Sequence, residues 1–249
     1  MHDPIRLNKA IARAGICSRR KADELISSGQ VKLNGLTVHE MGTMINPAKD
    51  KVVVQGKQIF PQTPGSDDHI YLIMNKPVQV MTTMSDPQAR KTVIDFLSAE
   101  LKNYRLFPVG RLDYFSEGLL IMTNDGELTH RLTHPSWKHP KVYRIEVREK
   151  PGIEAIKTME KGMTLKDGQK LAPAGVRLVS SEPGRFILEM TLIQGINRQI
   201  RRMCQDLGLT ILRLIRTDQG PLTLGSLRPG QSRQLSDREI TALKKSVGL

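Results

Sequence analysis

The stretch from Pro108 to Asn124, PVGRLDYFSEGLLIMTN, constrains the fold of this chain more than any other. Its second half, Gly118 to Met122, is a short continuous apolar run, which is typical of a strand buried on both faces of its sheet. Asp113 stands just before this run, after a glycine and an arginine. A carboxylate there could face a cleft while the sheet holds its backbone. The alternative for Asp113 is a solvated turn or an ordinary salt bridge.

Residues 70 to 249 around this stretch mix strands and helices without regular βαβ alternation. Strands are predicted at 70–74, 143–147, 186–192 and 209–217, the third with a clean alternation that buries one face. Helices are predicted at 92–104, 125–135, 153–159, 198–207 and from Ser236, which forms a capping box with Glu239. The sequence therefore predicts an α+β domain with a mixed, mainly antiparallel sheet flanked by helices and loops.

The first 60 residues predict a small module of two helices and short strands. Leu7, Ile11 and Ala14 share one helical face, and Gly15 is a natural end for that helix. Ser18 can cap a second helix, RRKADELISSG, which ends at Gly29. Short strands then follow on both sides of Asn34-Gly35, a strong hairpin signal, and at 52–54.

The polar faces of these two helices are basic. The cations are Arg6, Lys9 and Arg13 on the first helix and Arg19, Arg20 and Lys21 at the start of the second. If they converge on one surface, that surface suits a phosphate backbone. A charge run of this size is equally compatible with an ordinary solvated face.

The segment RLNKAIARAGICSRRKADELISSGQVKLNG closely resembles the small RNA-binding module named after ribosomal protein S-four. The resemblance spans about residues 5 to 50, with the arginine cluster, the glycine stops and the Asn-Gly turn in the family's order. It implies that the basic faces of the two helices bind structured RNA. We expect this RNA-binding domain at 1–60, a linker at 61–69, PQTPGSDDH, and a second domain at 70–249.

The charge of the chain favours a polyanionic partner. Thirty-eight Lys and Arg against 25 Asp and Glu give a formal net charge of +13, so nucleic acid is the leading candidate. No run approaches the 18 apolar residues of a membrane span, and the opening residues lack the apolar core of a signal peptide, so we expect no membrane partner and a cytoplasmic protein.

Metal and cofactor chemistry finds no support in the sequence. The two cysteines, Cys17 and Cys204, are far apart, and the closest histidine pair, His130 and His134, lacks a third ligand. No Gly-rich phosphate loop or dinucleotide fingerprint is present. We therefore expect no metal and no cofactor, and chemistry carried by side chains alone.

Arg198, Arg201 and Arg202 stand near the start of a predicted helix, where the helix dipole disfavours cations. An anion should compensate them, and Asp113, RNA phosphate or both could do so. The alternative is a plain surface helix with a basic edge.

Four further segments resemble, in order, bacterial ribosomal RNA pseudouridine synthases that carry the S-four-like module. They are Asn75-Lys76-Pro77, the GRLD run at 110–113, the Lys141-Val142-Tyr143 strand and the run from Gly195 to Met203. The resemblance covers essentially the whole chain. It implies that Asp113 is the essential aspartate, that Tyr143 stacks on the target base and that Arg201 pairs with the aspartate, without metal or cofactor.

The same resemblance places the RNA-binding cations. Those of the second domain are Lys76, Arg111, Arg198 and Arg202, in addition to Arg6, Lys9, Arg19, Arg20 and Lys21 of the first. The runs GICSRR and NRQIRRMC look most like the branch that modifies the large-subunit RNA, 23S, whereas THPSWKHPKVY resembles sister branches. A structured ribosomal RNA hairpin is the expected partner of a monomeric enzyme.

The chemistry of uridine isomerisation suits these residue types. An ionised carboxylate either attacks C1′ or removes the 2′ proton, and the sequence leaves both routes open. An arginine can orient it through a bidentate contact that lysine does not reproduce. The uridine must first leave the RNA stack, at a cost of a few kcal/mol, and stacking on Tyr143 would return about 1 to 3 kcal/mol.

Three alternatives to a 23S-specific isomerase stay open. The chain could act on the small-subunit RNA, 16S, instead. It could be a non-catalytic RNA-binding or ribosome assembly protein, although Asp113, Tyr143 and Arg201 together favour turnover. An RNA N-glycosidase or nuclease would release uracil or cut strands.

Overall fold

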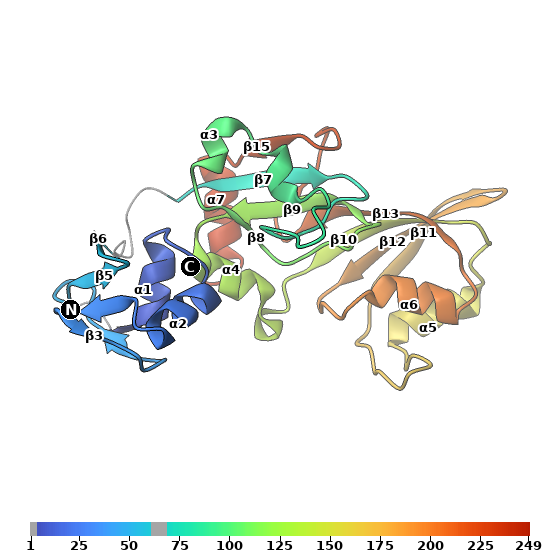
Figure 1. The fold of residues 1–249 in the computed structure, drawn as a ribbon. Coiled ribbons are helices and arrows are strands. Elements are labelled where there is room, and N and C mark those ends of the chain that lie inside the picture. Colours follow the sequence, from blue (N-terminus) through green and yellow to red (C-terminus); the bar gives the residue numbers. More distant parts are fainter. Residues whose placement is uncertain (1–3, 61–68) are drawn as a thin grey trace. The chain divides into compact units, whose positions relative to one another are not determined.

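The computed structural model describes residues 4–60 and 69–249. They form two compact units, one ending at His69 and one beginning at Ile70 (Figure 1). The linker expected at 61–69 lies outside the described residues except for His69.

The N-terminal unit contains the two predicted helices and a small sheet. Its helices are α1 (Leu7–Arg13) and α2 (Arg19–Ser27), and its strands are β1 (Ile5–Arg6), β2 (Val31–Leu33), β3 (Leu36–Thr37), β4 (Met44–Ile45), β5 (Val52–Val54) and β6 (Lys57–Ile59). As predicted, the Ser18 side chain caps α2 by accepting a hydrogen bond from the Lys21 backbone N–H. Apolar side chains of both helices and of β2, β4, β5 and β6 form one core.

The hairpin turn of this unit also follows the sequence. Asn34 and Gly35 both have positive φ angles, 51° and 87°, as a tight turn between β2 and β3 requires. Four strands pair in the order β3-β2-β5-β6, while β1 pairs with β4 separately.

The larger unit is built on a nine-stranded sheet. The strand order is β11-β12-β10-β13-β9-β7-β15, with β14 paired to β13 and β8 to β9. The bounds are β7 (Tyr71–Lys76), β8 (Phe107–Pro108), β9 (Glu117–Thr123), β10 (Lys141–Val147), β11 (Gly175–Glu182), β12 (Arg185–Leu192), β13 (Ile211–Gln219), β14 (Leu222–Thr223) and β15 (Ser232–Gln234). The β13–β9 ladder is parallel and the other described ladders are antiparallel. The predicted mixed, mainly antiparallel sheet is confirmed.

Helices cover the two halves of this sheet differently. They are α3 (Ala99–Lys102), α4 (Gly126–Thr133), α5 (Ile153–Lys161), α6 (Gln199–Asp206) and α7 (Asp237–Lys245), with short 3-10 turns η1 (Val93–Phe96) and η2 (Pro135–Trp137). Helices α5 and α6 pack on the half formed by β10, β11 and β12 (Figure 1). On the other half, α4 and α7 pack on one face of β7 and β9, and residues 80–112 pack on the other. Strand β9 is therefore buried on both faces, as its apolar run predicts.

Three details differ from the sequence-based expectation. The helix expected over 92–104 is broken, because Thr92 and Asp95 close a single 3-10 turn, Leu97 is extended, and Ser98 caps the separate helix α3. Strand β11 was not predicted, since most of its residues are exposed and show no clear period. Helix α6 begins at Gln199, because Arg198 adopts a left-handed conformation with φ of 49°.

Within the described residues, no helix combines the length and the apolar character that a bilayer span needs.

Candidate active site

A pocket of about 330 Å³ opens in the larger unit, where β10 and β13 meet the loop before β9 and the segment that leads into α6. Asp113, Tyr143 and Arg201 all line it, together with Arg111 and Arg198. The fold therefore brings five of the predicted residues, from three separate segments, to one cavity. Among the described residues that line this cavity, Asp113 is the one acid.

The loop that carries Asp113 is anchored at every residue from 112 to 116. Thr82 forms two hydrogen bonds with the backbone of Leu112. Its hydroxyl donates to the Leu112 carbonyl at 2.7 Å and accepts from the Leu112 N–H at 3.3 Å. The Gln79 backbone N–H donates to the Tyr114 carbonyl at 2.6 Å. Lysine and arginine side chains hold the remaining positions, so the carboxylate stands on a backbone with little freedom to move.

Lys76 supplies the first of these side-chain anchors. It is fully buried at the end of β7, and its ammonium donates to three backbone carbonyls, those of Pro77 (2.9 Å), Asp113 (3.1 Å) and Ser116 (2.8 Å). Burial lowers the pKa of Lys76 to about 8, against the opposing effect of the Asp113 and Glu117 carboxylates. Lys76 was expected to contact RNA, but in the structure its side chain is buried and its ammonium holds the Asp113 loop.

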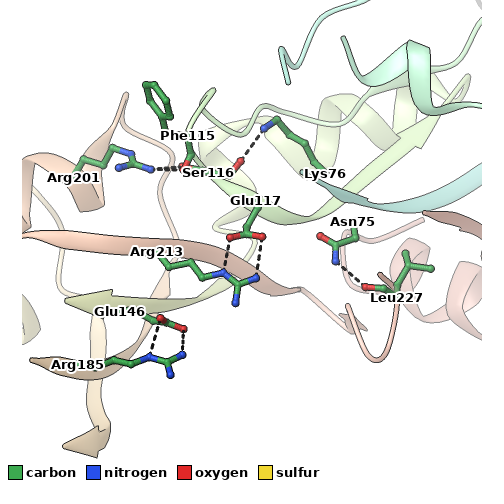
Figure 2. A network of polar contacts seen from close by, with 10 residues as sticks. All are labelled: Asn75, Lys76, Phe115, Ser116, Glu117, Glu146, Arg185, Arg201, Arg213 and Leu227. Carbon is green, nitrogen blue, oxygen red and sulfur yellow. Dashed lines mark hydrogen bonds and ion pairs between the residues drawn. The ribbon is translucent and has the colours of Figure 1, made fainter. Parts of the chain in front are cut away.

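Arg201 supplies the second anchor, from α6. Its Nη2 donates to the Phe115 carbonyl at 2.7 Å and lies 3.3 Å from the Ser116 hydroxyl. Figure 2 shows Lys76 and Arg201 approaching this short segment from opposite sides. Burial lowers the pKa of the Arg201 guanidinium, and the Asp113 carboxylate partly offsets that effect. The two charges are thus neighbours.

The expected bidentate contact between Arg201 and Asp113 is absent from the ion pairs and hydrogen bonds of the described residues. The guanidinium is turned to the Phe115 carbonyl and the Ser116 hydroxyl, two and three residues after the aspartate. It therefore orients the carboxylate through the loop and acts on its charge at longer range.

A glycine allows β9 to come close to β13 just after the Asp113 loop. Gly118 has a φ of 108°, and a Cβ at this position would overlap the backbone of Arg216 on the parallel neighbour β13. Next to it, Glu117 on β9 forms a bidentate pair with Arg213 on β13 at 2.7 and 3.0 Å (Figure 2). These two contacts fix the register of β9, and with it the place where the Asp113 loop ends.

The three arginines predicted near the start of α6 separate in the structure. Arg198 lines the pocket and is exposed. Arg201 holds the Asp113 loop, whereas Arg202 forms an ion pair with Asp167 and does not line the pocket. The charge expected to compensate them is therefore supplied in part by the protein itself. The remaining predicted RNA-binding residues, Arg6, Lys9, Arg19, Arg20 and Lys21, belong to the N-terminal unit.

Four further polar residues at the pocket were not predicted as site residues. His139, Arg216 and Gln219 are almost fully buried, and Lys141 is half-buried beside them. Lys141 donates to the His139 carbonyl at 3.1 Å. Burial and the charge of Arg216 lower the pKa of Lys141 to about 8. Burial and the charges of Lys141 and Arg216 lower the pKa of His139 to about 4. The one signal in the sequence was polar residues in the strand segments 141–147 and 211–219.

No group of three or more potential metal ligands gathers among the residues that the structure describes. The rings of His130 and His134 are 5.1 Å apart, and His134 Nδ1 lies 2.7 Å from the Ser136 hydroxyl.

Comparison with known proteins gives matches along the whole chain. A family model described as RNA pseudouridylate synthase matches residues 70–206, and the S4 domain model matches residues 5–47. An RNA pseudouridine synthase of Aquifex aeolicus is 42% identical over 246 residues, which cover 98% of this chain and 96% of that protein. The ribosomal large subunit pseudouridine synthase B of Bacillus subtilis is 38% identical over 243 residues, covering 96% and 95%.

A solved structure also matches over nearly the full length. A crystal structure of a pseudouridylate synthase superposes with a TM-score of 0.68 and 26% identity, covering 96% of this chain and 99% of that one.

Proposed function

From the premise that this chain belongs to the RNA pseudouridine synthase family, with an S4 domain at its N-terminus, we propose that it converts a specific uridine of ribosomal RNA to pseudouridine with Asp113 as the essential carboxylate. The reaction breaks the bond between C1′ and N1, turns the uracil, and joins C1′ to C5. The hydrogen on C5 is lost and N1 gains one, so no oxidant, reductant or second substrate is needed.

The observation that carries this proposal is the single carboxylate on a fully anchored loop. Asp113 is the one acid among the described residues of a pocket that Arg111, Arg198 and Arg201 also line. Both chemical routes need an anionic carboxylate at this position. As a nucleophile it would attack C1′, and as a base it would remove the 2′ proton. Because Lys76 and Arg201 hold its loop, little reorganisation is needed when substrate binds.

Tyr143 and Arg201 have separate roles in this proposal. Tyr143 is half-buried on β10, lines the pocket and packs against apolar side chains on both sides of it. Its ring is placed to stack on a uracil that has left the RNA helix. Arg201 acts as a positioning residue, because it touches the loop rather than the place where the sugar would lie.

The exposed cations divide into two RNA-binding sets. Arg111 and Arg198 are exposed at the pocket, where they would meet the phosphates beside the extruded nucleotide. Arg6, Arg19, Arg20 and Lys21 are exposed on the N-terminal unit, and with Lys9 they would bind the backbone of a structured RNA hairpin. Arg202 belongs to the first set only if RNA displaces Asp167 from it.

The large-subunit RNA is the proposed substrate because one relative of 38% identity is a ribosomal large subunit pseudouridine synthase. A monomer in the cytoplasm, where ribosomal RNA is made and folded, completes the proposal. The small-subunit RNA is tested alongside.

The test uses ribosomal RNA transcripts labelled with tritium at C5 of uridine. Because C1′ replaces the C5 hydrogen, the intact enzyme should release tritiated water in an amount that matches one or a few uridines, and pseudouridine mapping should locate them. Asp113→Asn should lower this release by at least about 10³-fold and leave RNA affinity within about twofold. Asp237→Asn, at an exposed acid in the first turn of α7, is the matched control.

Each alternative gives a different result in the same assay. A non-catalytic assembly protein would bind RNA and release nothing. An N-glycosidase would yield free uracil from the intact enzyme, and a nuclease would shorten the strands. Tritium release that Asp113→Asn leaves unchanged would contradict the role given to Asp113.

A further inference from the structure

The inner wall of the pocket carries buried polar atoms that have no partner in the protein. They include Gln219 Oε1, Arg216 Nη2 and His139 Nε2, and none of these three has a hydrogen bond among the described residues. The three side chains are 1%, 2% and 4% exposed. A buried donor or acceptor without a partner destabilises the folded protein. Three of them around one cavity indicate that a ligand completes them.

Their strands place them side by side. Strand β13 carries Arg216 and Gln219, and β10 pairs with it so that Tyr143 faces Arg216 and Lys141 faces Gln219. A register shift between Val142 and Tyr143 brings both pairs to the pocket. The Arg216 guanidinium uses one N–H on the Leu119 carbonyl at 2.7 Å and keeps Nη2 free. Among the described residues, the Lys141 ammonium makes one hydrogen bond, to the His139 carbonyl, which leaves two of its N–H groups without a partner there.

The burial of these residues separates them from the phosphate-binding set. Arg111 and Arg198 are exposed, so a phosphate reaches them without leaving water. Gln219 and Arg216 line the same pocket but are buried, so a group must enter the pocket to meet them. A phosphodiester would have no use for the Gln219 acceptor, because it offers oxygen acceptors alone. A nucleobase edge offers both kinds of group.

We propose that Gln219 and Arg216 read the Watson–Crick edge of the extruded uracil, with Gln219 Oε1 accepting from N3–H and Arg216 Nη2 donating to one of the flanking carbonyl oxygens. This inference rests on the proposed function, which it deepens. The second carbonyl oxygen would take an N–H of Lys141. Cytosine would present an acceptor at N3 and a donor at its amino group, so it would leave the same site unpaired.

The symmetry of this edge matters for the reaction. Uracil carries O2, N3–H and O4 in the order acceptor, donor, acceptor. When the detached base turns over about the axis through N3 and C6, N1 and C5 exchange places, O2 and O4 exchange places, and N3–H stays where it was. A central acceptor flanked by two donors therefore holds the base equally well before and after the turn. Gln219 is the fixed point of this arrangement.

Hydrogen bonds of this kind would retain the uracil in the pocket while it has no covalent bond to the ribose. Without the grip, the detached uracil could leave and a water molecule could add its oxygen to C1′. The base would then leave as uracil with the proton from that water, and the RNA would keep an abasic site. If Gln219 holds the uracil by this hydrogen bond, a variant without the acceptor should give some free uracil in addition to pseudouridine. A purely structural role of Gln219 would not produce this second product.

The test compares Gln219→Met, which matches the volume and lacks the acceptor, with Gln219→Glu, which keeps an acceptor oxygen. The same C5-tritiated ribosomal RNA reports both outcomes, because isomerisation releases tritiated water and escape releases tritiated uracil. Gln219→Met should slow single-turnover isomerisation about 10- to 100-fold, change RNA affinity less than about twofold, and release uracil as a tenth or more of the converted base. Gln219→Glu should recover at least about tenfold of the lost rate.

Gln205→Met, at an exposed glutamine of α6, is the matched control and should behave as the intact enzyme. The proposal is overturned if Gln219→Met turns over at the rate of the intact enzyme, or if it is slow with no free uracil and no recovery in Gln219→Glu. Should Gln219→Met fail to fold, Gln219→Glu is compared with the intact enzyme, and a loss of more than about 100-fold counts against the proposal. The proposed function is judged separately in every case. It requires that the intact enzyme releases tritiated water and that Asp113→Asn does not.

Discussion

The two units of this protein use the same basic side chains in opposite ways. In the N-terminal unit, Arg19 and Arg20 open α2 and are exposed, and neither has an ion pair among the described residues. In the larger unit, Lys76 and Arg216 are almost completely buried and donate to backbone carbonyls. The sequence shows cations of one kind in both units. Burial separates those that attract a polyanion from those that organise a site.

The difference follows from where each charge can be solvated. An exposed cation loses little hydration when it meets a phosphate, so its contribution falls steeply with salt and depends weakly on its exact position. A buried cation has already lost its water, and it is retained only where carbonyl or carboxylate oxygens replace that water. Its contribution is geometric and is insensitive to salt. The predictions below test this contrast.

The largest effect is expected at Lys76. We predict that Lys76→Met lowers single-turnover activity about 100-fold, because the carbonyls of Asp113 and Ser116 lose the donor that fixes the loop. Removal of a buried charge offsets part of the lost hydrogen bonding, so the free energy of unfolding should change by less than about 2 kcal/mol. Tritium release and urea unfolding followed by the fluorescence of Trp137, the one tryptophan of the chain, measure the two quantities.

Lys161→Met, at an exposed lysine of α5, is the control and should alter neither. A Lys76→Met protein with normal turnover and weakened RNA binding would break the contrast, because Lys76 would then act as an RNA-binding cation despite its burial.

The sequence predicted the N-terminal unit more completely than the larger one, for reasons visible at particular residues. Ser18, Gly15 and the Asn34-Gly35 turn act on their own neighbours, so local chemistry is enough to place both helices and the hairpin. In the larger unit, β7 was expected to end before Asn75. It runs through Lys76 because the backbone of this residue pairs with β9 and its ammonium donates to the carbonyl of Ser116. No local sequence pattern indicates partners so distant in sequence.

The site was predicted in part for the same reason. Asp113, Tyr143 and Arg201 stand in recognisable motifs, and they line one pocket. Arg201 was expected on the carboxylate, and it contacts the following backbone instead. Gln219 was not predicted at all. In a strand that also carries Arg213, Arg216 and Asp218, alternation alone does not tell which polar residues face a pocket and which face solvent.

A smaller effect is expected from the exposed cations. Replacing Arg19, Arg20 and Lys21 together by alanine should weaken RNA binding about 30-fold at 0.15 M salt and make the dependence of log affinity on log salt shallower by about two to three. Alanine favours helix, and the exposed Lys21–Glu24 pair contributes little, so α2 should persist. Fluorescence anisotropy with a ribosomal RNA transcript across a salt series measures both quantities.

Turnover at saturating RNA should stay within about threefold in this variant, because the pocket is unchanged. The double variant Lys157→Ala and Lys161→Ala on α5 removes exposed cations elsewhere and serves as the control. A salt dependence as steep as that of the intact protein would show that α2 does not meet phosphate.

The smallest effect is expected from His139, whose pKa is about 4 because of burial and the charges of Lys141 and Arg216. The unfolded chain, with a histidine pKa near 6.5, binds more protons between pH 6.5 and 4, so this residue makes stability fall as pH falls through that window. The ring faces an open pocket, where solvent relaxes part of the difference, so about 1 kcal/mol is expected. His139→Asn should remove this loss in urea unfolding at pH 4.5 relative to pH 7, while His39→Asn in the N-terminal unit should retain it. If His139→Asn keeps the same loss of stability at low pH, burial and the neighbouring cations do not disfavour the charged form of His139. The exposed and buried cations of the two units would then differ in their hydrogen bonding alone.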